Sequence, residues 1–159
     1  MGDAKRMMIA RIAAIALLLL PLAHHAAAET GGMIPSAGQA FAPLPTDQPV
    51  RRGMLAIRDL VRTNHSLVTH RRMPPDHAAR FAKQVKAEAD TILATSKIAG
   101  DAREKLRALL DEIAAGIDAV AKPKAGADPT AGLVCADEAL ARYAKEFDHP
   151  GWAPLQSLD

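Results

Sequence analysis

Four stretches of the chain repeat aliphatic side chains at alternating steps of three and four residues, and proline or glycine bounds each stretch. This spacing places the aliphatic side chains along one face of an α-helix. It predicts helices over about 50–71, 75–99, 102–121 and 129–147. No stretch shows the two-residue alternation that is typical of a half-buried β-strand. The predicted fold class is therefore all-α.

The length and composition favour one helical bundle. The chain has 159 residues, which is enough for one domain. Aromatic residues make up only 3% of it, and much of the hydrophobic content is alanine, which suits close packing of helices. Four helices with short connections predict an antiparallel up-down-up-down four-helix bundle. The alternative is a three-helix bundle whose first helix is loosely docked or used in a dimer.

Prolines and acidic residues mark the expected helix ends. Pro74-Pro75 ends the first helix and begins the second, because proline is tolerated only in the first turn. Gly100 suits a left-handed residue that closes the second helix. Asp101 with Glu104 has the spacing of a capping box for the third helix, and Asp128 is the expected N-cap of the fourth.

Each predicted helix has one stripe of residues expected to face the core. The stripes are Val50, Met54, Ile57, Val61, His65 and Val68; Ala78, Phe81, Val85, Ala89 and Ile92, flanked by Ala82 and Leu93; Leu106, Leu109, Leu110, Ile113, Ile117 and Val120; and Leu133, Ala136, Leu140, Tyr143 and Phe147. Gly116 also lies on the third stripe. Because glycine has no side chain, we expect it to let a neighbouring helix approach closely.

The first part of the chain has the order of a secretory signal peptide. Three basic residues precede or open an almost uncharged run over 9–22, and 26–28 is Ala-Ala-Ala. This order predicts a signal peptide over 1–28 and a periplasmic or secreted protein with no membrane segment after cleavage. The alternative is an uncleaved membrane anchor, although the apolar run is short for a membrane span. Residues 29–49 are rich in Pro, Gly and Ala, which predicts a flexible leader before a bundle domain over 50–159.

The charge balance restricts the class of partner. Removal of residues 1–28 leaves 17 basic and 17 acidic residues, so that the mature chain is neutral. A nucleic-acid partner would require a basic surface, and none is expected here. The one cysteine, Cys135, excludes an internal disulfide, and an intermolecular one is the alternative to a free thiol that behaves as a small hydrophobe.

No cofactor motif is present. Covalent haem attachment requires C-x-x-C-H, and Cys135 is followed by Ala-Asp-Glu-Ala. Haem bound without a covalent link would need an axial ligand in the core, where His65 is the only candidate histidine. Di-iron bundles carry a Glu-x-x-His motif on each of two helices, and the sequence does not contain two such motifs. We therefore expect no haem or di-iron cofactor.

One group of side chains has the chemistry of a metal site. His65, His70, Met73 and His77 lie at the join between the first and second helices, and imidazole with thioether ligands suits copper or another transition metal. His70 and Met73 are three residues apart, but His65 and His70 are five apart and point in different directions on a helix. The alternative is that these are solvated histidines near the negative end of a helix dipole.

Asp148-His149 near the end of the chain resembles a catalytic pair. It is followed by Pro150-Gly151-Trp152, which predicts a turn that folds Trp152 back onto the end of the bundle. We therefore interpret this segment as structural.

The segment 143–152, Tyr-Ala-Lys-Glu-Phe-Asp-His-Pro-Gly-Trp, resembles the ending of a family of small exported bacterial proteins known as DnrO-like. The segments 46–54 and 98–120 are similar to this family too. The resemblance implies a helical bundle comparable to cytochrome c-prime without its haem, and it implies no established activity and no functional residues. Thr95-Ser96 stands where the family pattern has Asn-Cys, so no shared thiol chemistry is implied.

Together these observations predict an exported, non-enzymatic accessory or binding protein. One pair of helices, or the leader, would contact a protein partner or a second copy of the chain. The alternative is a periplasmic metal-binding protein that uses His65, His70, Met73 and His77.

Overall fold

The computed structural model describes residues 42–153 and residue 155. The predicted signal peptide and residues 29–41 of the predicted leader lie outside these described residues.

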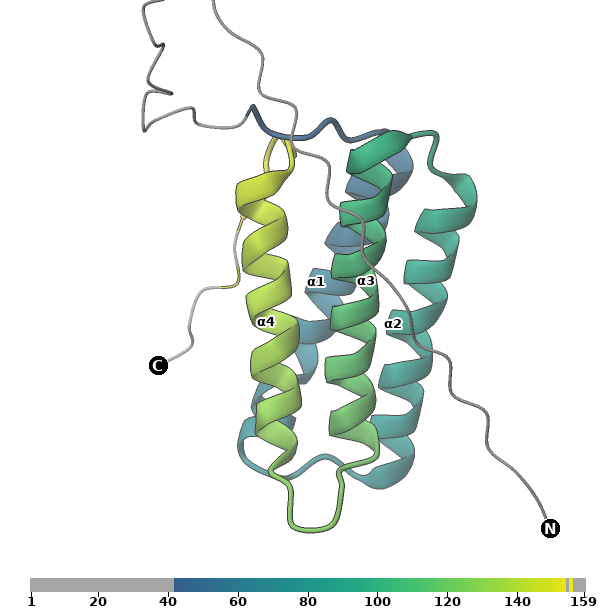
Figure 1. The fold of residues 1–159 in the computed structure, drawn as a ribbon. Helices are drawn as coiled ribbons and strands as arrows, with labels where there is room; N and C mark the ends of the chain where they lie inside the picture. The colour runs from purple at the N-terminus through teal and green to yellow at the C-terminus, as the bar shows by residue number, and fades with distance from the viewer. Residues whose placement is uncertain (1–41, 154, 156–159) are drawn as a thin grey trace, which may run out of the picture. The chain divides into compact units, whose positions relative to one another are not determined.

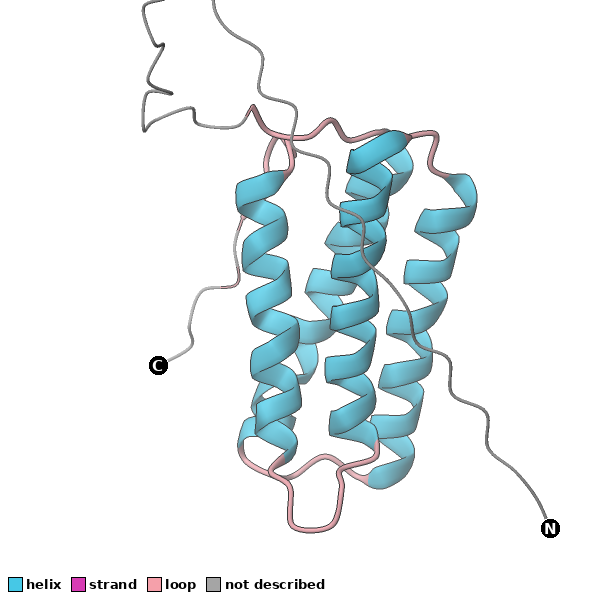
Figure 2. Cartoon of the chain, in the orientation of Figure 1, coloured by secondary structure: helices cyan, strands magenta, loops and turns pink. Residues whose placement is uncertain are grey.

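The described residues form a four-helix bundle. The helices are α1 (Gln48–Thr69), α2 (Pro75–Thr95), α3 (Gly100–Ala121) and α4 (Pro129–Glu146). Each helix packs against the next one in sequence, and α4 packs against α1, which closes the ring (Figure 1). Consecutive helices run in opposite directions, and the described segments between them are loops (Figure 2). The prediction of an all-α, up-down-up-down four-helix bundle is confirmed.

The predicted stripes form the core, with one exception in α1. The stripe residues of α2, α3 and α4 are buried, apart from the flanking Ala82 and Leu93, which are partly buried. In α1, however, the buried polar residue is Asn64, which is 5% exposed, while His65 is only half-buried. The prediction that His65 faces the core is therefore wrong. Neighbouring residues are about 100° apart on a helix, so Asn64 enters the core as His65 turns toward α4.

One of the three expected helix caps is confirmed, and the other two differ from the prediction. Asp128 caps α4 by accepting a hydrogen bond of 3.0 Å from the backbone N–H of Thr130. The predicted capping box of α3 is wrong, because α3 begins at Gly100 and no side chain caps it. Gly100 does have the expected left-handed backbone, with φ of +58°, but it opens α3 and does not close α2.

Asp47 holds the start of α1 to the loop between α2 and α3. Its carboxylate accepts hydrogen bonds from the N–H of Val50 at 3.0 Å, the N–H of Lys97 at 2.7 Å and the hydroxyl of Ser96 at 3.0 Å. Burial raises the pKa of Asp47, but these hydrogen bonds outweigh burial and hold it below its usual value. The Asp47 contacts stabilise the loop that follows Thr95, where α2 ends four residues earlier than predicted.

The segment before α1 pairs with the segment after α4. Leu44 donates a backbone hydrogen bond of 2.7 Å to Glu146 and accepts one of 2.8 Å from Asp148. Leu44 and Phe147 form the one isolated parallel bridge found in the described part of the chain. The two ends of the bundle domain are therefore fixed to each other.

Across the described residues, no helix combines the length and the apolar character that a membrane span requires.

Candidate functional site

Two glycines allow the backbones of α3 and α4 to come into contact where these helices cross. A Cβ atom placed on Gly116 would lie 2.5 Å from the carbonyl oxygen of Gly132, and one placed on Gly132 would meet the carbonyl oxygen of Gly116. Real Cβ atoms do not approach oxygen so closely, so both positions require glycine. The expectation that Gly116 permits close helix packing is confirmed, and Gly132 is its partner.

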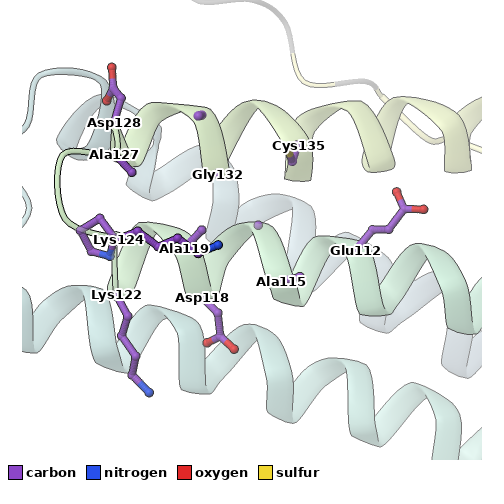
Figure 3. A pocket seen from close by; sticks show the side chains of 13 residues that line it. Glu112, Ala115, Asp118, Ala119, Lys122, Lys124, Ala127, Asp128, Gly132 and Cys135 are labelled. Carbon is purple, nitrogen blue, oxygen red and sulfur yellow. The ribbon is translucent and has the colours of Figure 1, made fainter.

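An open groove of about 730 Å³ lies along the outer side of this crossing (Figure 3). Small side chains line most of it, from Ala115 and Ala119 on α3 and from Ala131 and Cys135 on α4. Because these side chains are short and the two backbones are close, the surface forms a depression along the line where the helices meet. We call the outer surface of this helix pair, including the groove, the α3–α4 face.

Two consecutive side chains of α4, those of Val134 and Cys135, are exposed. Val134 is 48% exposed and is the one large hydrophobic side chain classed as exposed within the described ranges. Cys135, which follows it, is exposed and has a free thiol. The thiol therefore lies on the surface beside the groove and does not pack in the core as a small hydrophobe.

Charged side chains stand at the two ends of the groove. Lys122, Lys124 and Asp128 lie at the end near the α3–α4 loop, Glu112 lies at the opposite end, and Asp118 lies on α3 between Lys122 and Glu112 (Figure 3). Asp128 pairs with Arg71 at 3.0 Å. Its pKa is lowered chiefly by the hydrogen bond from the Thr130 N–H.

Sequence reasoning found only half of this site. Gly116 stood out because a glycine on an aliphatic stripe needs a reason. A close contact at Gly132 is not predicted from the sequence, although this glycine lies in the first turn of α4 and next to a second line of small residues. The signal that was available is the pairing of two small-residue lines on consecutive antiparallel helices, one at 115, 116 and 119 and the other at 131, 132 and 135.

The histidines of the predicted metal group have separate protein partners. Nε2 of His65 lies 3.7 Å from a carboxylate oxygen of Asp137 on α4. Burial raises the pKa of Asp137, and the charge of His65 works against this rise. His70 is exposed, and its Nδ1 lies 2.8 Å from the carbonyl oxygen of Ser66 in the preceding turn.

The remaining two members of the group also lie apart from a shared centre. Nε2 of His77 lies 2.7 Å from Oδ1 of the buried Asn64, so this contact joins α2 to α1. Met73 is partly buried and packs against the hydrophobic core. Within residues 42–153 and 155, no three His, Cys, Asp or Glu side chains are placed to hold one metal ion. A metal site formed by His65, His70, Met73 and His77 stays a prediction.

The Asp148-His149 pair belongs to a packed cluster at the end of the bundle. His149 is 8% exposed, and its Nδ1 lies 2.8 Å from the hydroxyl of Tyr143. The Trp152 ring lies against both, with centroid distances of 4.9 Å to Tyr143 and 5.0 Å to His149. Trp152 therefore folds back onto the bundle, as the sequence predicted, and it covers the histidine.

Comparison with protein-family models, with curated protein sequences and with solved structures finds no match for this chain. The function of the site is therefore inferred from the geometry of its residues.

Proposed function

We propose that this chain is an exported, non-enzymatic binding protein that contacts another protein through the α3–α4 face. The observation that carries this proposal is the apolar groove over the Gly116–Gly132 crossing. Exposed apolar patches on soluble proteins commonly mark contact sites for other proteins.

The shape of the groove favours a protein partner over a small molecule. Sites for small molecules bury most of the ligand surface and present a few convergent polar groups. This groove is open along its length, and its floor is formed by small apolar side chains. A helix or a flat helical surface fits such a floor, because short side chains allow the partner to approach closely.

The reactive side chains of the domain support a binding role over a catalytic one. His149 is buried behind Trp152, and His77 is engaged with Asn64. Neither lies in the groove, whose lining holds one thiol, that of Cys135. Export is proposed from the signal-like order of residues 1–28.

A photo-reactive residue placed in the groove tests this function. Benzoylphenylalanine at position 115 lies in the groove, whereas the same residue at position 87 lies on the exposed side of α2. Irradiation of cells that export the protein should give one discrete cross-linked protein from position 115 and none from position 87. The added substitution Ala119→Arg should remove the product. Absence of a product from position 115, or equal products from both positions, would refute the proposal.

A further inference from the structure

We infer, building on the proposed function, that the protein covering the α3–α4 face is a second copy of this chain. The two copies would be related by a two-fold axis, with their α3 helices antiparallel. The argument rests on the positions of four charged side chains relative to the Gly116–Gly132 crossing. We call Lys122 with Lys124 the basic end of the face, and Glu112 with Glu138 the acidic end. Asp128 also lies at the basic end, where it is paired with Arg71, and Asp118 lines the groove.

The two ends lie at similar distances on opposite sides of the crossing. Lys122 is six residues beyond Gly116, which corresponds to about 9 Å along the axis of α3. Glu138 is six residues beyond Gly132 on α4, and α4 runs the other way, so Glu138 lies about 9 Å on the other side. Glu112 is four residues before Gly116, about 6 Å on that same side.

The basic end and Glu138 form no ion pair in the described part of the chain, and Glu112 pairs only with Arg142. All four side chains of the two ends are exposed. Lys122, Lys124 and Glu138 are therefore available to the charges of a partner, and rim charges of this kind determine orientation more than affinity.

A two-fold axis through the crossing makes the face complementary to itself. When the copies are antiparallel, the basic end of each copy lies over the acidic end of the other. When the copies are parallel, the basic ends meet and the acidic ends meet, which is repulsive. Symmetric dimers use one self-complementary patch on both subunits, and the antiparallel arrangement meets that requirement.

The apolar part of the face also suits this partner. Val134 is exposed on α4, one helical turn from Ala131, which lines the groove. Each copy thus offers an exposed valine on α4 and a groove lined by small residues. Cys135 lies three residues beyond Gly132, so the Cα atoms of the two cysteines would be about 9 Å apart along the helix axis. Disulfides require Cα atoms within about 7 Å, so the dimer is non-covalent and withstands a reducing agent.

Charge reversal on each end separately provides the test. Lys122→Glu with Lys124→Glu places acidic ends against each other, and Glu112→Lys with Glu138→Lys places basic ends against each other. In sedimentation equilibrium at low salt we expect the unchanged protein to dimerise at micromolar concentration. Each double variant should dimerise roughly 10- to 100-fold more weakly, because several exposed ion pairs become repulsive. An equimolar mixture of the two variants should recover the affinity, because a heterodimer pairs opposite charges at both ends.

Lys83→Glu with Lys86→Glu on α2 is the matched control, and it should leave the dissociation constant unchanged. Far-ultraviolet circular dichroism verifies that every variant stays helical. If the unchanged protein is still monomeric at a concentration of roughly 100 micromolar, the dimer proposal is refuted. A mixture that associates no better than its components, or a control that weakens equally, also refutes it. If the protein is monomeric while position 115 cross-links to a different protein, the dimer fails and the proposed function stands.

Discussion

The hydroxyl of Tyr143 lies 2.8 Å from Nδ1 of His149, and the two rings meet edge to face in the interior of the bundle end. Tyr143 has no exposed surface. Burial raises the pKa of its phenol, with the charge of Arg51 opposing, so the phenol stays protonated and can donate to a neutral imidazole. This contact fixes the segment after α4 to α4 itself.

This pair predicts a loss of stability in mild acid. Burial lowers the pKa of His149, and the charges of Arg51 and Arg58 lower it further. In the unfolded chain this histidine binds a proton near pH 6.5, whereas in the folded chain it does so only at lower pH. The free energy of unfolding is therefore highest above about pH 7 and decreases as the pH falls through 6.5. Urea unfolding at pH 7.5 and pH 5.5 measures this. His149→Gln should reduce the difference between the two pH values, and an unchanged difference would show that His149 does not cause it.

The Gly116–Gly132 crossing predicts an inverted response to alanine. Alanine normally stabilises a helix interior by about 0.5–1 kcal/mol relative to glycine. Gly116→Ala should instead destabilise the protein by about 1–3 kcal/mol, because its Cβ would meet the carbonyl oxygen of Gly132. Ala115→Gly at the adjacent exposed position is the control, and it should cost only about 1 kcal/mol of helix propensity. A stabilised Gly116→Ala variant in urea unfolding would show that the helices are not in close contact.

Asp47 should contribute more to stability than an ordinary helix cap. Asp47→Ala removes the cap of α1 and the contacts to Ser96 and Lys97, so we expect a cost of about 2–4 kcal/mol. Asp128→Ala removes the cap of α4 and should cost about 1 kcal/mol. Because the pKa of Asp47 is lowered, its contribution is present above the unfolded value near 3.8 and is lost as the pH falls below it. Equal costs for the two variants in denaturant unfolding would mean that the loop contacts contribute nothing.

His77 should matter for stability and His70 should not. His77→Ala leaves Oδ1 of the buried Asn64 without its partner, which costs about 1–3 kcal/mol. His70 is exposed, so His70→Ala should change the free energy of unfolding by less than about 0.5 kcal/mol. Thermal unfolding of the two variants compares them, and similar midpoints would contradict this role of His77.

The sequence was sufficient for the architecture because the periodicity of the apolar residues determines which face of each helix is buried. Residues such as Leu106 and Leu140 could be placed in the core from spacing alone. Spacing could not decide between Asn64 and His65, because both lie within one step of the stripe. The residue at which α2 ends could not be predicted from spacing either, because the loop that follows it contacts Asp47, which is far away in the sequence.

The candidate site was harder to predict than the fold. A groove depends on how closely two helices approach, and this distance is determined jointly by Gly116 on one helix and Gly132 on the other. Each glycine alone is compatible with ordinary packing. The predicted group of three histidines and Met73 was selected for its chemistry, but the fold directs each histidine to a different neighbour.

The accessibility of Cys135 after the cell has exported the protein tests the central claim, that another protein covers the α3–α4 face. The rate at which a membrane-permeable maleimide alkylates this thiol is measured in intact cells and in dilute purified protein. The ratio of the rate in cells to the rate in purified protein is compared with the same ratio for a cysteine at position 87, in a chain that also carries Cys135→Ser. We expect alkylation of Cys135 to be slower in cells by about tenfold or more relative to position 87, as for a thiol that is mostly covered. Equal ratios for the two positions would contradict the account, because the face would then be open to solvent in the cell.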